Sequence, residues 1–146
     1  MAGTHRTKDW EIGLDAWAAG LFDGEGCIDL RRDMRKKCYG LRLRVSLKYP
    51  RPLYVLVGRY GGELIPAKWR GGRTAWVWHL HKAQEIDRVL RVWLPWLVEK
   101  RAQAEVGLKF TAMVARRTPR RVYSESEQRR CATWATRLGD LKRHQT

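Results

Sequence analysis

The chain has 146 residues, of which 44% are hydrophobic and eight are tryptophan. This length and composition suit one folded domain with a single core and argue against wholesale disorder. The polar N-terminus lacks the apolar segment of a secretory signal, and no apolar run approaches the roughly 20 residues of a membrane span. We therefore expect no membrane partner.

Charge and cysteine content narrow the possible partners further. Lysine and arginine number 30 against 15 aspartate and glutamate, which gives a net charge of +15. Such an excess attracts polyanions, most commonly the phosphate backbone of nucleic acids. The three cysteines are odd in number and form no C-x-x-C pair. This pattern argues against a disulfide framework or a structural zinc site and favours a reducing, intracellular compartment.

The first part of the chain changes from helical to strand periodicity. Residues 10–24 carry apolar side chains at the three- and four-residue spacing of one helix face. Residues 27–34 and 41–48 alternate apolar and polar side chains around a turn, which predicts a β-hairpin. In the second strand, alternate residues are leucine or valine, and arginine, serine and lysine lie between them. One side of the hairpin is therefore apolar and the other cationic.

The second part of the chain repeats this order. A helix is predicted over 49–62 from its early prolines and final glycines. Strands over 63–70 and 74–82 and helices over 83–97 and 98–117 follow. The order predicts an α+β fold, with a four-stranded antiparallel sheet and helices on one face. We divide the chain into a main domain, 1–115, and a basic tail, 116–146, with one short helix near 126–141.

The polar face of this sheet is predicted to bind nucleic acid. A solvated face usually mixes charges, whereas residues 27–48 contain eight basic and only two acidic side chains. A two-stranded ribbon fits the major groove, where arginine reads guanine. The predicted DNA-binding residues are Asp29, Arg31, Asp33, Arg35, Arg42, Arg44, Ser46, Lys48, Lys68 and Arg70. The two aspartates either accept hydrogen bonds from cytosine or hold arginines in place.

Two further pairs occupy the fourth predicted strand. Trp76 and Trp78 share a face, and they are predicted either to stack on DNA as outward platforms or, in the other register, to belong to the core. His79 and His81 also share a face. A pair that faces solvent or phosphate is preferred over a metal site, because no further ligands lie nearby.

The segment AAGLFDGEG, residues 18–26, combines three helix-weakening glycines with two acids. Gly20 and Gly24 share one helix face, where small residues let a second helix approach closely. A helix from a second copy, related by a two-fold axis, would bring two Glu25 carboxylates together. Mg²⁺ would relieve their repulsion and assist phosphodiester hydrolysis. The alternative is a simple helix C-cap.

The same nine residues resemble the signature of the LAGLIDADG homing endonucleases. Glu25 replaces an aspartate, and the identical positions are Ala19, Gly20, Leu21, Asp23 and Gly26. The YGGEL segment at 60–64 and a P-x-L-x-x-K-x-x-Q-A pattern at 95–104 also resemble family segments. The resemblance covers about residues 10–115.

This resemblance implies an αββαββα fold whose saddle-shaped sheet lies along the DNA major groove. It implies a homodimeric, Mg²⁺-dependent, intron-associated endonuclease that acts on a long, near-palindromic DNA site. A non-cleaving DNA-binding protein and a maturase that binds intron RNA are permitted alternatives on the same fold.

The resemblance also implies roles for individual residues. Glu25, with Gly24 beside it, is expected at the metal, and Lys100 near the scissile phosphate. Asp23 joins this catalytic group in a capping or positioning role. The implied dimer interface consists of Ala19, Gly20, Asp23 and Gly24. The family's water-ordering glutamine has no counterpart in this chain, and Ser46 or Lys48 is the expected substitute.

Overall fold

The computed structural model describes residues 8–68, 71–118 and 122–144. Helix α1 (Asp9–Glu25) leads into strands β1 (Gly26–Asp33) and β2 (Cys38–Leu47). Helix α2 (Arg51–Tyr60) precedes strands β3 (Glu63–Lys68) and β4 (Thr74–Leu80). Helix α3 (Ala83–Trp93), the short 3₁₀ helix η1 (Leu94–Trp96), α4 (Arg101–Ala115) and α5 (Glu125–Arg143) complete the chain. The predicted α+β order is confirmed.

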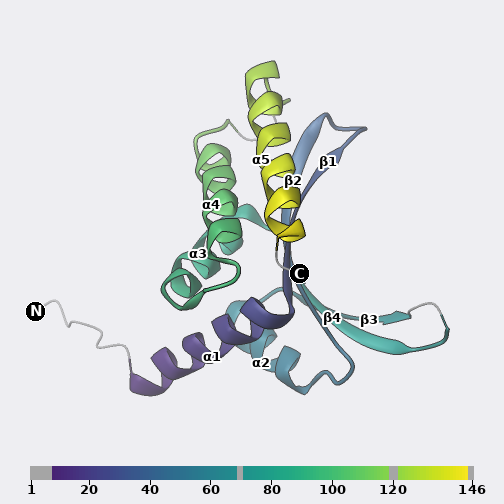
Figure 1. The fold of residues 1–146 in the computed structure, drawn as a ribbon, viewed down its shortest axis with the longest axis vertical. Helices are drawn as coiled ribbons and strands as arrows, with labels where there is room; N and C mark the ends of the chain where they lie inside the picture. The colour runs from purple at the N-terminus through teal and green to yellow at the C-terminus, as the bar shows by residue number, and fades with distance from the viewer. Residues whose placement is uncertain (1–7, 69–70, 119–121, 145–146) are drawn as a thin grey trace, which may run out of the picture.

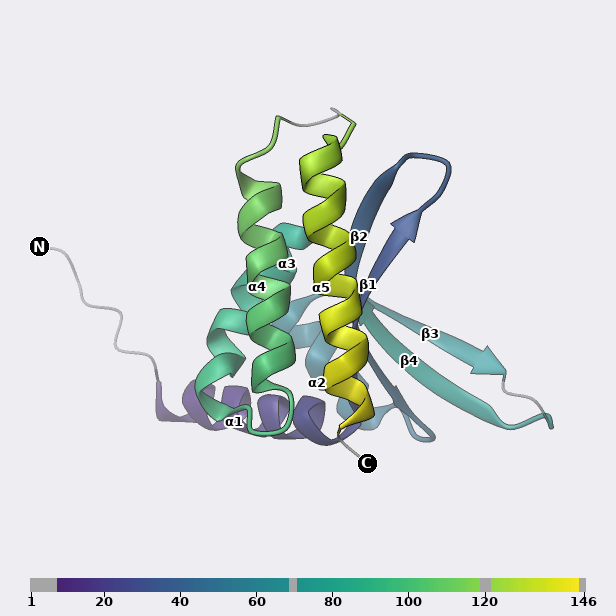
Figure 2. The ribbon, with the colours of Figure 1, turned by 45° about the horizontal axis from the view of Figure 1, so that its top comes forward.

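The four strands form one antiparallel sheet in the order β1-β2-β4-β3. The β1–β2 and β3–β4 hairpins splay apart towards their turns, whereas the helices gather on one side of the sheet (Figures 1 and 2). Pairing of Ile28 with Leu43, and of Leu43 with Leu80, aligns the apolar side chains of three strands on one face. We call this the inner face and the opposite one the outer face.

The core forms between the inner face and the helices. Ile28, Leu43 and Trp78 are fully buried there. Gly107 of α4 packs so closely that an added Cβ would lie 3.0 Å from the Leu90 side chain and 3.5 Å from that of Leu41. This close approach holds α4 against the sheet. None of the described helices is long and apolar enough to cross a bilayer.

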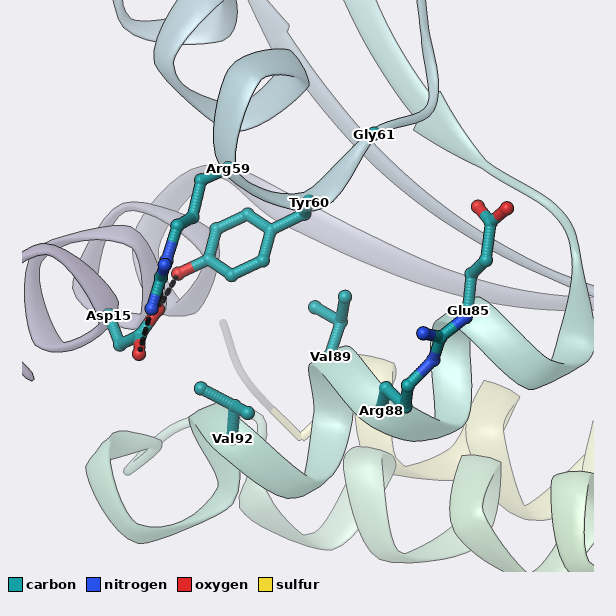
Figure 3. Close-up of a pocket in the computed structure, with 8 residues that line it drawn as sticks. All are labelled: Asp15, Arg59, Tyr60, Gly61, Glu85, Arg88, Val89 and Val92. Atoms are coloured by element: carbon teal, nitrogen blue, oxygen red, sulfur yellow. Dashed lines mark hydrogen bonds and ion pairs between the residues drawn. The ribbon is translucent and has the colours of Figure 1, made fainter. Parts of the chain in front are cut away.

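A buried acid connects α1 to α2. The Asp15 carboxylate accepts hydrogen bonds from the Arg59 guanidinium at 3.1 and 3.2 Å and from the Tyr60 hydroxyl at 2.6 Å (Figure 3). Burial and the Asp15 hydrogen bond raise the pKa of Tyr60. These groups line a cavity of about 370 Å³ among α1, α2 and α3. Because a buried ion pair fixes geometry more than it adds stability, we interpret the contact as a brace for α1.

The segment expected to be a basic tail with a short helix near 126–141 carries α5, a helix of 19 residues. Ser124 and Glu127 form a capping box at its start. Cys131 and Leu138 are buried in the common core, and the Tyr123 hydroxyl donates to the Tyr39 carbonyl at 3.1 Å. Residues 122–144 therefore pack as part of the same folded unit, with α5 against α4 and β1.

The two edge strands of the sheet are protected differently. Helix α5 lies beside β1 (Figure 2). Strand β3 has six residues and includes Pro66, which has no amide hydrogen. All three cysteines, Cys27, Cys38 and Cys131, are free thiols.

Candidate catalytic end and nucleic-acid interface

The first candidate site lies where α1 ends. We call Asp23, Glu25 and Lys100 the helix end. The Asp23 carboxylate accepts backbone hydrogen bonds from Val98 at 3.1 Å, from Glu99 at 3.2 Å and from Lys100 at 2.9 Å. Asp23 therefore organises the loop before α4. Its negative charge also interacts favourably with the positive N-terminal end of that helix. These contacts correspond to the capping or positioning role expected for Asp23.

Lys100 lies against the same helix end. Its ammonium donates to the Asp23 carbonyl at 2.5 Å, and the residue is 8% exposed. This carbonyl belongs to the last turn of α1, where backbone acceptors lack helical partners and a cation is favourable. Lys100 thus places a positive charge at the carbonyl of Asp23, which precedes Glu25 by two residues.

Glu25 differs from its neighbours because it is exposed. Its carboxylate makes no hydrogen bond or ion pair with another residue that the structure describes. Gly26 follows, and a Cβ there would lie 2.5 Å from the Phe22 carbonyl oxygen and 2.3 Å from its ring. Only glycine therefore allows the chain to turn from helix into strand at this point. The local fold leaves Glu25 free at the corner.

A stripe of exposed residues runs along α1. Gly20 and Gly24 are exposed, and a Cβ added at either would meet no atom within 4 Å. Exposed Trp10 and Trp17 and the intervening Gly13 continue this face at three- and four-residue spacing. We call these five residues the α1 stripe. Ala19, predicted at a dimer interface, is 0% exposed within the single chain. That prediction is wrong for Ala19, because its side chain belongs to the core.

The second candidate site is the outer face of β1 and β2. Arg42 and Arg44 of β2 project there, opposite Asp29 and Cys27 of β1. Arg31, paired with Gly40, has the same orientation, and Ser46 occupies the next such position on β2. We call Asp29, Arg31, Arg42, Arg44 and Ser46 the arginine face. The alternation in the sequence assigned these residues to the correct side of the sheet.

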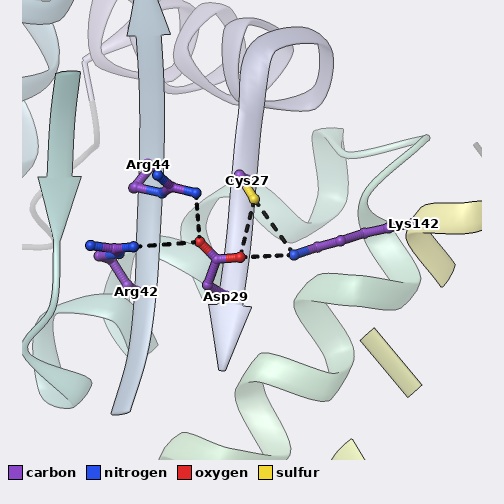
Figure 4. Close-up of polar contacts among 5 residues, drawn as sticks. All are labelled: Cys27, Asp29, Arg42, Arg44 and Lys142. Carbon is purple, nitrogen blue, oxygen red and sulfur yellow. Dashed lines mark hydrogen bonds and ion pairs between the residues drawn. The ribbon is translucent and has the colours of Figure 1, made fainter. Parts of the chain in front are cut away.

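Asp29 is at the centre of this face (Figure 4). One carboxylate oxygen lies 2.8 Å from Nη2 of Arg44 and 3.8 Å from Nη2 of Arg42. The other lies 3.0 Å from Nζ of Lys142, at the end of α5. Burial raises the pKa of Asp29, but the hydrogen bond and charge of Lys142 and the charge of Arg44 outweigh it, so the pKa lies below its usual value. Lys142 was missed because no local pattern links residues 113 positions apart.

The other predicted acid on this hairpin has a local role. Asp33 accepts backbone hydrogen bonds from Arg35 at 3.0 Å and from Lys36 at 3.2 Å. It therefore caps the turn between β1 and β2, in which Lys37 has a left-handed backbone conformation with φ of 48°. Arg35 is exposed in the same turn.

Three predicted DNA contacts lie elsewhere. Trp78 is 0% exposed and donates its Nε1–H to the Gly61 carbonyl at 2.8 Å, so the core alternative is correct for it. Trp76, two residues away on the same strand face, packs against the core. Lys68 pairs with Thr74 and therefore lies on the inner side of its hairpin, away from the arginine face. Arg70 falls outside the described residues.

The fourth strand contributes histidine to the outer face. His79 pairs with Arg44 in the sheet, and its Nε2 lies 3.1 Å from a Glu63 carboxylate oxygen. Its ring stacks on His81 with 5.7 Å between centroids. Ser46 and Lys48 lie at the far end of β2, in a hollow shared with the turn at 71–74.

The fit of these residues to a divalent metal is partial within one chain. Carboxylate oxygen suits Mg²⁺, and Glu25 offers one that is free. Both Asp23 oxygens are occupied by backbone donors. No group of three or more histidine, cysteine, aspartate or glutamate side chains that could hold a metal occurs in the described part of the chain. Among the described residues, Glu25 is thus the one acid of the helix end whose carboxylate is open to a metal.

The fold is that of the LAGLIDADG homing endonucleases, although no family model and no curated protein matches the sequence. The homing endonuclease I-CvuI, solved with the I-CreI DNA target, is 23% identical with a TM-score of 0.72, over 91% of this chain and 85% of that one. The archaeal intron-encoded I-Vdi141I, solved with DNA, is 12% identical with a TM-score of 0.74, over 90% and 85%. The LAGLIDADG meganuclease I-AabMI, bound to uncleaved DNA, is 14% identical with a TM-score of 0.65, over 83% of this chain and 43% of that one.

Proposed function

We propose that this chain is a site-specific DNA endonuclease that acts as a homodimer with a divalent cation, Mg²⁺ in the first instance. The observation that carries the proposal is the exposed Glu25 carboxylate, which has no partner in the described part of the chain, beside a cationic sheet face. The solved structures of this fold that are described as DNA complexes support the same substrate.

The dimer is supported by the α1 stripe. Two helices that meet at Gly20 and Gly24 can approach closely, because neither residue has a side chain to hold them apart. Trp10 at 61% and Trp17 at 43% exposure would lose their contact with water in such an interface. The chain also matches only 43% of I-AabMI, so a second copy would supply a comparable length. In a two-fold dimer the α1 stripes face each other and both Glu25 residues meet near the axis.

The work of this chain's own residues then divides between two places. The paired Glu25 carboxylates would hold the cation, which would supply Lewis-acid stabilisation of the phosphate and an activated water. Asp23 keeps the loop at 98–100 fixed against α1, so Lys100 holds its charge at the same end. The arginine face binds the duplex by phosphate contacts and base-edge hydrogen bonds.

A randomised duplex library tests the proposal. Incubated with Mg²⁺, the protein is expected to cut a near-palindromic site, and EDTA is expected to abolish cutting while much of the binding remains. Binding to one DNA site without cutting under any divalent cation would identify a non-cleaving DNA-binding protein. Retention of structured intron RNA, with no nicking of DNA, would identify a maturase.

A further inference from the structure

The acid of the arginine face, Asp29, lies beside three cations. These are Arg42 and Arg44 of the same face and Lys142 of α5. Asp29 is 14% exposed at its side chain, and it is within 3.0 Å of both the Arg44 guanidinium and the Lys142 ammonium. Arg42 lies directly across the ladder from Asp29, and Arg44 lies one step further along the same face. Figure 4 shows that the two guanidinium groups approach the carboxylate from β2, whereas Lys142 approaches it from α5.

Asp29 fixes groups that would otherwise repel each other. Burial and the charges of Arg44 and Arg31 lower the pKa of Arg42, which reflects this crowding of cations. The ion pairs with Asp29 engage Nη2 of each arginine. The buried Nε atoms of Arg42 and Arg44 have no hydrogen-bond partner among the described residues. Each guanidinium has five N–H donors, and because the Arg42 and Arg44 side chains are 31% and 33% exposed, donors other than the buried Nε–H remain for an external acceptor.

Helix α5 determines where Lys142 lies. The helix is fixed at its start by the Ser124 capping box and along its length by buried Cys131 and Leu138. Its last turn brings the Lys142 ammonium to Asp29 and to the Cys27 sulfur, 3.5 Å away. One carboxylate oxygen of Asp29 thus accepts a hydrogen bond from Lys142 of α5, and the other faces Arg42 and Arg44.

We infer that Asp29 is a positioning residue that holds Arg44, and with it Arg42, for guanine recognition, and that Lys142 makes α5 a specificity-determining element. Guanine is the base concerned, because its O6 and N7 acceptors match the paired donors of a fixed guanidinium. The inference rests on the proposed DNA function and adds to it the base that this face selects.

Four variants test it by binding selection from a library with randomised half-sites. The parent protein is expected to prefer G by about tenfold to a hundredfold at the position that Arg44 contacts. Asp29→Asn keeps the shape but removes the charge, and the preference should fall below about threefold. Lys142→Met should weaken the same preference by about threefold or more, and Lys142→Arg should restore it. Arg137→Met removes one exposed charge elsewhere on α5 and should leave the preference unchanged.

The combination of variants separates positioning from general electrostatics. Because Lys142 acts through Asp29, the double variant Asp29→Asn/Lys142→Met should select no less sharply than Asp29→Asn alone. Thermal unfolding of each variant records whether the fold is retained. A preference at that position equal in Lys142→Met and Arg137→Met would overturn the inference while leaving the proposed function intact. Selection of no DNA site by the parent would overturn both.

Discussion

The helix end and the arginine face both place an acid among cations, yet they treat it in opposite ways. At the helix end, Asp23 and Lys100 contact backbone groups, and Glu25 has no partner among the residues that the structure describes. On the arginine face, Asp29 is surrounded by three cations. An unpaired carboxylate is available for a metal, whereas a neutralised one holds its neighbours still. The comparison therefore predicts chemistry at the first place and recognition at the second.

The largest expected effect comes from Glu25→Gln. Loss of the metal-binding charge should lower the cleavage rate by on the order of 10³-fold, whereas affinity for the site should stay within about threefold, because the proposed phosphate contacts lie on the sheet. Single-turnover cleavage and binding titrations measure the two separately. Glu105→Gln, an exposed acid on α4, is the matched control. Equal cleavage rates for the Glu25 variant and the parent would contradict the assignment of the chemistry to the helix end.

Asp23→Ala tests the other acid of the helix end. Three backbone N–H groups would lose a charged acceptor, so the free energy of unfolding should fall by about 2–4 kcal/mol. Glu25→Ala removes no contact within the described chain and should change it by less than about 0.5 kcal/mol. Urea denaturation compares the two variants directly. Similar losses for both would show that Glu25 is a structural residue rather than a free one.

Gly20→Leu addresses the need for two copies at the helix end. The new side chain meets open space within one chain but would separate two packed helices. We expect the dimer dissociation constant to rise by about a hundredfold or more, since overpacking costs a few kcal/mol. Gly58→Leu, at an open position on α2, controls for the gain in helix propensity. Sedimentation velocity measures the dimer dissociation constant. An unchanged dimer in the Gly20 variant would show that the α1 stripe is not part of the interface.

The smallest effect concerns the arginine face in acid. Because the folded pKa of Asp29 is lowered from 3.8, its contribution to stability is present above that pH and is lost as pH falls through the folded value. Asp29→Asn should therefore flatten the acid limb of the unfolding free energy below about pH 4, by less than about 1 kcal/mol. Unfolding curves at several pH values measure this slope. A parallel acid limb in the variant would mean that the cations do not stabilise the charge.

Local sequence patterns sufficed for the strands and for the arginine face, because alternation along β2 sorts its side chains by face. They were insufficient where that alternation is weak. In β3 apolar residues occupy both sides, so the orientation of Lys68 could not be inferred. The sequence is compatible with two registers for Trp76 and Trp78, and only the pairing with β2 distinguishes them.

Helix α5 was underestimated because its two core residues, Cys131 and Leu138, are seven positions apart in a largely polar sequence. Its burial depends on contacts with β1 and α4, which are distant in the chain. The partner of Asp29 was hidden for the same reason. At the helix end, by contrast, glycine spacing and the position of two acids are enough to predict a site, because both lie within the single segment 18–26.

The protected margins of the sheet also bear on how crowded copies behave. Basic proteins accumulate along a polyanion, where neighbouring molecules meet at high local concentration. At such concentrations an exposed edge strand can pair with a strand of another molecule and start aggregation. Here α5 shields β1, and Pro66 interrupts the row of amide donors on β3. If copies gather on one duplex as proposed, these protected edges would disfavour fusion of their sheets and leave the helices as the surfaces for pairing.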